Sequence, residues 1–151
     1  MKKLKILLLA MVIFSFCTCT KSPGLGGTST IKGKVVVDNI NILGNIVDSY
    51  DAQDLDVYII YGKENSTYDD DQKTSHDGSF EFKYLNPGDY EIFVYSECMF
   101  CPQGQDSLIL QSVKISKANE VNELDTIHVS NSLTSLAVSY THLRAHETKW
   151  H

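Results

Sequence analysis

The run Cys98-Met99-Phe100-Cys101 places two cysteines three positions apart, and this is the local feature of the chain that most clearly suggests chemistry. In thiol oxidoreductases this spacing stands at the N-terminus of a helix, whose dipole lowers the pKa of the thiol. Here a strand pattern precedes the pair, and Pro102-Gln103-Gly104 follows without helical periodicity. We therefore expect a structural loop disulfide or an inert thiol pair, with metal binding and redox activity as the alternatives.

Metal ligands are sparse elsewhere. A zinc site at the cysteines would need two more ligands, and outside the C-terminal tail only His76 and His128 are available besides carboxylates. We expect both histidines to be surface or hydrogen-bonded residues and not bases. Carboxylates that could supply oxygen ligands to Ca²⁺ are the weak candidates Asp69, Asp70, Asp71 and Asp77. Their spacing matches no calcium loop, and a solvated acidic turn is the usual explanation of such a run.

Signatures of hydrolytic catalysis are absent from the sequence. Outside the C-terminal tail, where His142 and His146 stand four apart, it contains no nucleophile elbow, no zinc-binding histidine pair and no paired-carboxylate context. We therefore expect a protein that is not an enzyme and uses no cofactor.

The body of the chain reads as short alternating strands separated by turn residues, with no amphipathic stretch long enough for a helix. This pattern predicts an all-β fold, a single small immunoglobulin-like or transthyretin-like β-sandwich of about seven strands. Residues 39–54 form a polar excursion with a short helical or strand piece. The expected strands cover residues 31–38, 55–61, 72–75, 79–85, 90–95, 108–116 and 123–129.

Two turns carry local signals. His76-Asp77-Gly78 suits a tight hairpin, because the Asp-Gly pair tolerates positive φ. Asn86-Pro87-Gly88-Asp89 places Pro and Gly at the second and third positions of a type II turn, from which the next strand is expected to run back as a hairpin.

The run Asp77-Gly78-Ser79-Phe80-Glu81-Phe82, followed by Leu85, Pro87-Gly88 and Tyr90, resembles the carboxypeptidase regulatory-like, or transthyretin-like, β-sandwich family. The opening residues 31–35 fit the first strand of that family, whereas the long 39–54 excursion departs from its compact members. The resemblance implies a binding, spacer or accessory module. A hydrolase shares this fold, but its histidine-bearing strands and C-terminal signature have no match here, and fold alone does not imply activity.

The N-terminus has the features of an export signal. Lys2, Lys3 and Lys5 precede an apolar run from residue 6 to 16, too short for a permanent transmembrane helix. The following segment resembles the lipobox of bacterial lipoproteins, with Cys19 as the lipidated residue after the small Cys17 and Thr18. We expect lipid anchoring in the cell envelope, at the outer membrane of a Gram-negative bacterium. Residues 19–30, rich in Gly, Ser and Thr, read as a flexible tether.

The C-terminal residues differ from the rest in composition. Residues 138–151 contain the only arginine of the chain, Arg144, the only tryptophan, Trp150, and three of the five histidines. The stretch VSYTHLRAHET resembles a translated sequencing adapter, so residues 137–151 are excluded from functional argument. Without this tail and the signal, eight lysines stand against eighteen carboxylates, a net charge of −10. A domain this acidic repels nucleic acid phosphates.

The expected organisation is a signal peptide (1–18), a lipidated tether (19–30), a β-sandwich (31–136) and a non-native tail (137–151). The leading hypothesis for function is a non-catalytic envelope module that contacts protein or glycan through its loops. The alternative is a thiol- or metal-handling accessory protein that uses Cys98 and Cys101. Exposure of Phe93 and Tyr95 on the outward face would favour partner binding.

Overall fold

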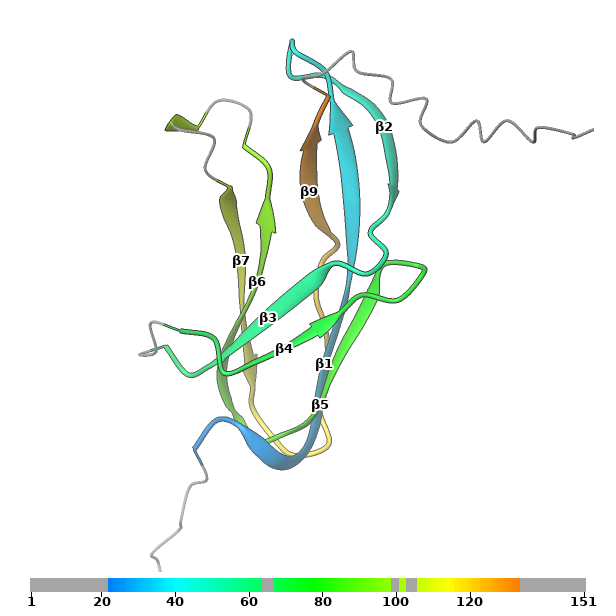
Figure 1. Ribbon diagram of the computed structural model, residues 1–151. Coiled ribbons are helices and arrows are strands. Elements are labelled where there is room, and N and C mark those ends of the chain that lie inside the picture. Colours follow the sequence, from blue (N-terminus) through cyan, green and yellow to red (C-terminus); the bar gives the residue numbers. More distant parts are fainter. Residues whose placement is uncertain (1–21, 64–66, 99–100, 103–105, 134–151) are drawn as a thin grey trace, which may run out of the picture.

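The computed structural model describes residues 22–63, 67–98, 101–102 and 106–133, which form two β-sheets packed face to face (Figure 1). The predicted all-β sandwich is confirmed, and the described residues form nine strands where about seven were expected. Among these residues, no helix is long and apolar enough to cross a bilayer. The strands are β1 (Leu25–Ile40), β2 (Ile46–Asp51), β3 (Asp56–Tyr61), β4 (Asp70–Lys73), β5 (Ser79–Leu85), β6 (Gly88–Ser96), β7 (Ser107–Ile115), β8 (Val121–Glu123) and β9 (Ile127–Ser132).

The first sheet is built around β1, a strand of 16 residues. Its first half pairs antiparallel with β5 and parallel with β8, and its second half pairs antiparallel with β2 and parallel with β9. The polar excursion between residues 39 and 54 therefore contributes an edge strand, β2, whose six residues are all exposed. The second sheet has the order β4-β3-β6-β7 and is entirely antiparallel.

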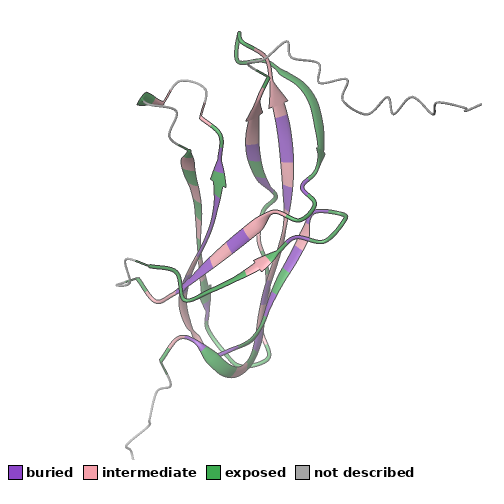
Figure 2. Cartoon of the chain, in the orientation of Figure 1, coloured by how far each residue is buried: buried purple, intermediate pink, exposed green. Residues whose placement is uncertain are grey.

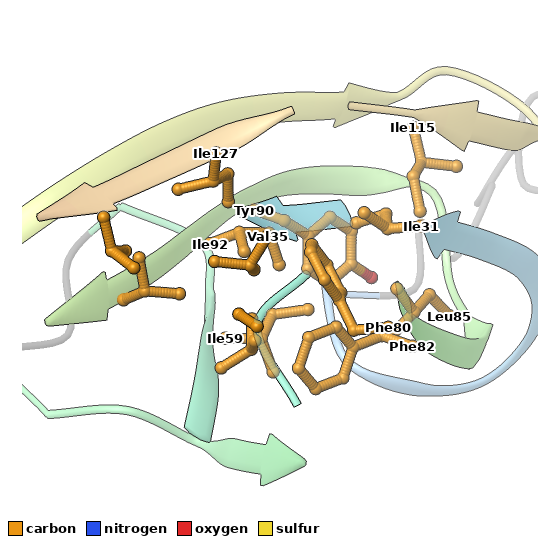
Figure 3. Close-up of a cluster of buried hydrophobic side chains, with 14 of the residues drawn as sticks. Ile31, Val35, Ile59, Phe80, Phe82, Leu85, Tyr90, Ile92, Ile115 and Ile127 are labelled. Carbon is orange, nitrogen blue, oxygen red and sulfur yellow. The ribbon is translucent and has the colours of Figure 1, made fainter. Parts of the chain in front are cut away.

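Alternating apolar side chains from both sheets fill the space between them. Phe80, Phe82 and Leu85 enter from β5, and Tyr90 and Ile92 enter from β6, as Figure 3 shows. Each of these side chains is at most 5% exposed. The buried positions appear as purple bands on both sheets in Figure 2. The aromatic alternation of residues 79–85 thus predicts the core face of its strand correctly.

Both predicted hairpins are wrong in their pairing. A turn does form at Gly78, where φ is +75° and the amide donates to the carbonyl of Ser75. However, β4 belongs to the second sheet and β5 to the first, and β5 and β6 are also in different sheets. Each connection therefore leads from one sheet to the other. The physical reason is that the apolar faces of β5 and β6 must oppose each other across the sandwich to be buried.

The flexible tether predicted for residues 19–30 is corrected for residues 25–30, because β1 begins at Leu25. The buried hydroxyl of Tyr90 accepts the amide of Gly24 at 2.9 Å and donates to the carbonyl of Asn86 at 2.6 Å. Asn86 in turn donates its side-chain amide to the carbonyl of Leu25 at 2.9 Å. These long-range contacts convert a Gly- and Ser-rich stretch into ordered strand. Cys19 and residues 137–151 lie outside the described residues.

Candidate functional site

An aromatic cluster covers the outer face of the four-stranded sheet. Side chains alternate along a strand, so the burial of Val57 and Ile59 in the core directs Tyr58 to the other face. By the same rule, burial of Ile92 and Val94 directs Phe93 and Tyr95 outward. The register places Tyr58 opposite Phe93, so aromatic side chains from β3 and β6 are neighbours.

The rings contact one another directly. Tyr58 stacks on Phe93 with centroids 5.0 Å apart and an interplanar angle of 16°. Tyr95 meets both rings edge-on, with centroid distances of 5.7 Å to each. Tyr68, just before β4, lies 4.8 Å from Tyr58. Distances of this size are those of favourable aromatic pairs, so the cluster holds its rings in a defined arrangement.

Part of this cluster is open to solvent. Tyr68 and Tyr95 are 51% and 52% exposed, whereas Phe93 is only 6% exposed. The expectation of exposure thus holds for Tyr95 and fails for Phe93, because neighbouring side chains cover the Phe93 ring. On β7, Leu110 lies opposite Phe93 and Leu108 opposite Tyr95, which extends the apolar surface to the sheet edge. We call Tyr58, Tyr68, Phe93, Tyr95, Leu108 and Leu110 the aromatic face.

Charged groups border the aromatic face on the β4 side. Asp56 forms an ion pair of 3.0 Å with Lys73, and Asp71 stands opposite Tyr58 in the register. Partial burial, reinforced by the charges of Asp56, Tyr68 and Asp71, raises the pKa of the Tyr58 hydroxyl. That hydroxyl therefore remains a neutral hydrogen-bond donor throughout the physiological range. The surface combines ring faces with donors and acceptors at their rim.

The cysteine pair forms a disulfide between Cys98 and Cys101, whose Cα atoms are 5.3 Å apart. The amide of Cys101 also donates to the carbonyl of Cys98 at 3.4 Å. This small ring closes directly after β6, close to one end of the sheet that carries the aromatic face. In this state neither sulfur is a free thiol or thiolate ligand.

The calcium candidates do not form one ligand cluster. Asp69 accepts the amide of Tyr61 at 2.7 Å, and Asp70 accepts the amide of Asp71 at 2.9 Å. Asp77 accepts both the amide and the hydroxyl of Ser79, and these hydrogen bonds lower the pKa of its carboxyl. In the part of the chain that the structure describes, no three His, Cys, Asp or Glu side chains are placed to hold a metal ion.

A Ser–Asp–His constellation that sequence reasoning did not find lies on the outer face of the first sheet. Ser49 donates its hydroxyl to Asp38 at 2.5 Å, and the Nδ1 atom of His128 lies 2.9 Å from the other carboxylate oxygen. The hydrogen bond from Ser49 and the contact with His128 lower the pKa of Asp38. Serine and histidine both contact the carboxylate instead of each other, so His128 cannot activate Ser49 as in a catalytic triad. His76 is exposed in the turn after β4.

A cavity of about 820 Å³ lies beside β1, β4 and β5. Its lysines suggest an anion site, but each is paired with a carboxylate. The pairs are Lys32–Glu123 (3.1 Å), Lys34–Asp51 (2.7 Å), Lys73–Asp56 (3.0 Å) and Lys83–Glu81 (2.9 Å). Because these cations are already neutralised by neighbours, the cavity does not offer the unbalanced positive charge that an anionic ligand requires.

No protein-family model and no curated protein matches the chain. Among solved structures, it is similar to a candidate carbohydrate-binding protein from Pseudomonas aeruginosa, with a TM-score of 0.44 and 12% identity over 75% of this chain and 92% of the other. It is also similar to a 9R-lipoxygenase from Cyanothece, with a TM-score of 0.39 and 14% identity over 68% of this chain and 16% of that enzyme.

Proposed function

We propose that this protein is a non-catalytic binding module of the bacterial envelope, which binds a glycan on its aromatic face. The observation that carries the proposal is the cluster of contacting rings, in which Tyr68 and Tyr95 remain half exposed. Exposed aromatic clusters on small domains mark interaction surfaces.

A glycan suits this surface better than a protein partner does. Sugar rings present C–H groups that pack on aromatic faces, and hydroxyl groups that hydrogen-bond to carboxylates and phenols at the rim. Here Asp56 and Asp71 stand beside the ring of Tyr58 and supply those acceptors. Stable protein interfaces use about 20–30 residues a side, whereas the aromatic face comprises six, enough for a few sugar units.

The likeness of residues 77–90 to the carboxypeptidase regulatory-like family supports the same proposal, since such domains accompany enzymes or transporters as accessory modules. The lipobox-like segment supports attachment of the module to the outer membrane through a lipid on Cys19. Replacing Cys19→Ala should then release the protein from membranes. Continued acyl labelling of that variant, lost instead with Cys17→Ala, would reassign the lipid.

Binding is tested on an array of bacterial cell-wall and capsular oligosaccharides, probed with fluorescently labelled protein. We expect binding that falls at least tenfold in Tyr95→Ala and in Tyr68→Ala. The matched control is Tyr50→Ala, because Tyr50 is 47% exposed but lies on β2 of the other sheet. Absence of binding to every glycan, or equal loss in Tyr50→Ala and Tyr95→Ala, would contradict the proposal.

A further inference from the structure

Gly24, the residue directly before β1, is only a few positions from the proposed lipid on Cys19. Gly24 is held from both sides, since its amide donates to the hydroxyl of Tyr90 and its carbonyl accepts the amide of Asn86 at 2.9 Å. Two residues into β1, a Cβ atom on Gly27 would lie only 1.9 Å from the carbonyl oxygen of Leu85. The backbone is therefore packed tightly against its neighbours from Gly24 onward.

Only four residues, 20–23, separate Cys19 from Gly24. A fully extended chain covers at most about 3.6 Å per residue, so Gly24 can lie no farther than about 18 Å from Cys19. From Ser29 to Ile40, in contrast, β1 extends over about 36 Å at the rise of a β-strand, while its first residues form a bulge because Leu25 and Ser29 both lie opposite Leu85. Figure 1 shows the start of β1 at one end of the sandwich and the β1–β2 turn at the other.

The end of the sandwich next to Gly24 carries exposed side chains of the kind found at membrane interfaces. Leu25 is 60% exposed, Tyr84 is 69% exposed and Val121 is 62% exposed. Leu25 lies opposite Leu85 in the register, directly beside Tyr84, and Val121 pairs with Thr30. Tyrosine with a polar tip and apolar body favours the boundary between lipid and water.

The backbone at Tyr84 supports a role for its exposure. Its φ is +60°, a left-handed conformation that is uncommon for an aromatic residue. Burial of the ring does not compensate for this conformation, because the side chain points into solvent. A strained backbone that exposes a largely apolar ring to water suggests that the ring contacts another surface.

We propose that this end of the sandwich rests on the membrane that holds the lipid, with Leu25, Tyr84 and Val121 at the bilayer interface. The inference rests on the lipid at Cys19 in the proposed function. It sets the orientation of the module: the long axis of β1 rises from the bilayer, and the turn at residues 41–45 points away from it. The aromatic face is then roughly perpendicular to the membrane plane and is accessible from the side.

The orientation is tested with the full lipidated chain in vesicles of phosphatidylethanolamine and phosphatidylglycerol that carry nitroxide-labelled head groups. A thiol-reactive fluorophore is placed at Val121→Cys or, as the distal control, at Leu43→Cys in the β1–β2 turn. We expect quenching at position 121 to exceed that at position 43 several-fold. Equal quenching, or stronger quenching at position 43, would overturn the orientation.

Two further measurements separate the parts of the proposal. Protein that fails to sediment with the vesicles overturns the lipid anchor itself, whereas sedimentation with equal quenching overturns only the orientation. Inserting twelve Gly and Ser residues after Thr20 removes the length constraint. We expect the contrast between positions 121 and 43 to survive this insertion and to fall at least twofold when Tyr84→Asn is added, since Asn tolerates the backbone at that position. Loss of the contrast on insertion alone would overturn the contact by these side chains.

Discussion

Replacing Tyr90→Phe removes one hydroxyl from the sandwich and keeps the ring that fills the core. The hydroxyl is fully buried and makes hydrogen bonds to Gly24 and Asn86, one as acceptor and one as donor. Each hydrogen bond contributes about 1 kcal/mol, and an unsatisfied buried group costs about 1–3 kcal/mol. We expect the free energy of unfolding to fall by about 2 kcal/mol. For a domain of this size, the melting temperature would fall by about 10 °C.

The measurement is urea unfolding followed by far-UV circular dichroism, with hydrogen exchange at the amide of Gly24 as the local readout. Tyr50→Phe is the control, and we expect it to stay within about 0.5 kcal/mol of wild type because Tyr50 is half exposed on an edge strand. In Tyr90→Phe, exchange at Gly24 should accelerate before global unfolding. A loss below about 0.5 kcal/mol with unchanged exchange at Gly24 would refute the role of the hydroxyl in holding the start of β1.

Three further predictions concern other parts of the chain. The folded state lowers the pKa of Asp38, so the stabilisation from its carboxylate is present above the ordinary carboxyl pKa and is lost as the pH falls through the folded pKa. We therefore expect Asp38→Asn to reduce the loss of stability below about pH 4, as measured by unfolding at different pH values. The double variant Cys98→Ser, Cys101→Ser should fold and lose about 1–3 kcal/mol in urea unfolding, since the loop it opens is short. A non-folding chain, or fast thiol–disulfide turnover by the wild type in a reductase assay, would contradict that structural role. Deleting residues 137–151 should leave the melting curve nearly unchanged, and a large drop would mean that the tail completes the sandwich.

Local alternation predicted the strands well where both faces of a strand have distinct environments. The expected strand 79–85 coincides with β5, because its phenylalanines face the core and its charged residues face solvent. The same alternation could also have predicted part of the aromatic face. In residues 55–61, placing Val57 and Ile59 in the core leaves Tyr58 on the outer face, where it becomes the centre of the ring cluster.

Pairing between distant segments could not be read from local patterns. Asn86-Pro87-Gly88 signals a reversal of the chain but does not reveal that the next strand joins the opposite sheet. Residues 24–29 have the composition of a linker, yet their order depends on Asn86, Tyr90 and Lys117, which lie more than 60 positions away. Likewise, the contact between Asp38 and His128 spans 90 positions. These features depend on the tertiary fold.

The central place of β1 has a consequence for when this protein can fold. Val35 pairs with Ile127 and Val37 with Val129, so the first strand along the chain is completed by the last one that the structure describes. Contacts of such high sequence separation form slowly, because the loop between them must close first. A chain exported with its N-terminus leading would emerge with β1 unable to complete its sheet until residue 129 has followed. If the chain is exported as we propose, this topology would delay folding until the segment up to residue 129 has been translocated, and the chain would stay extended during translocation.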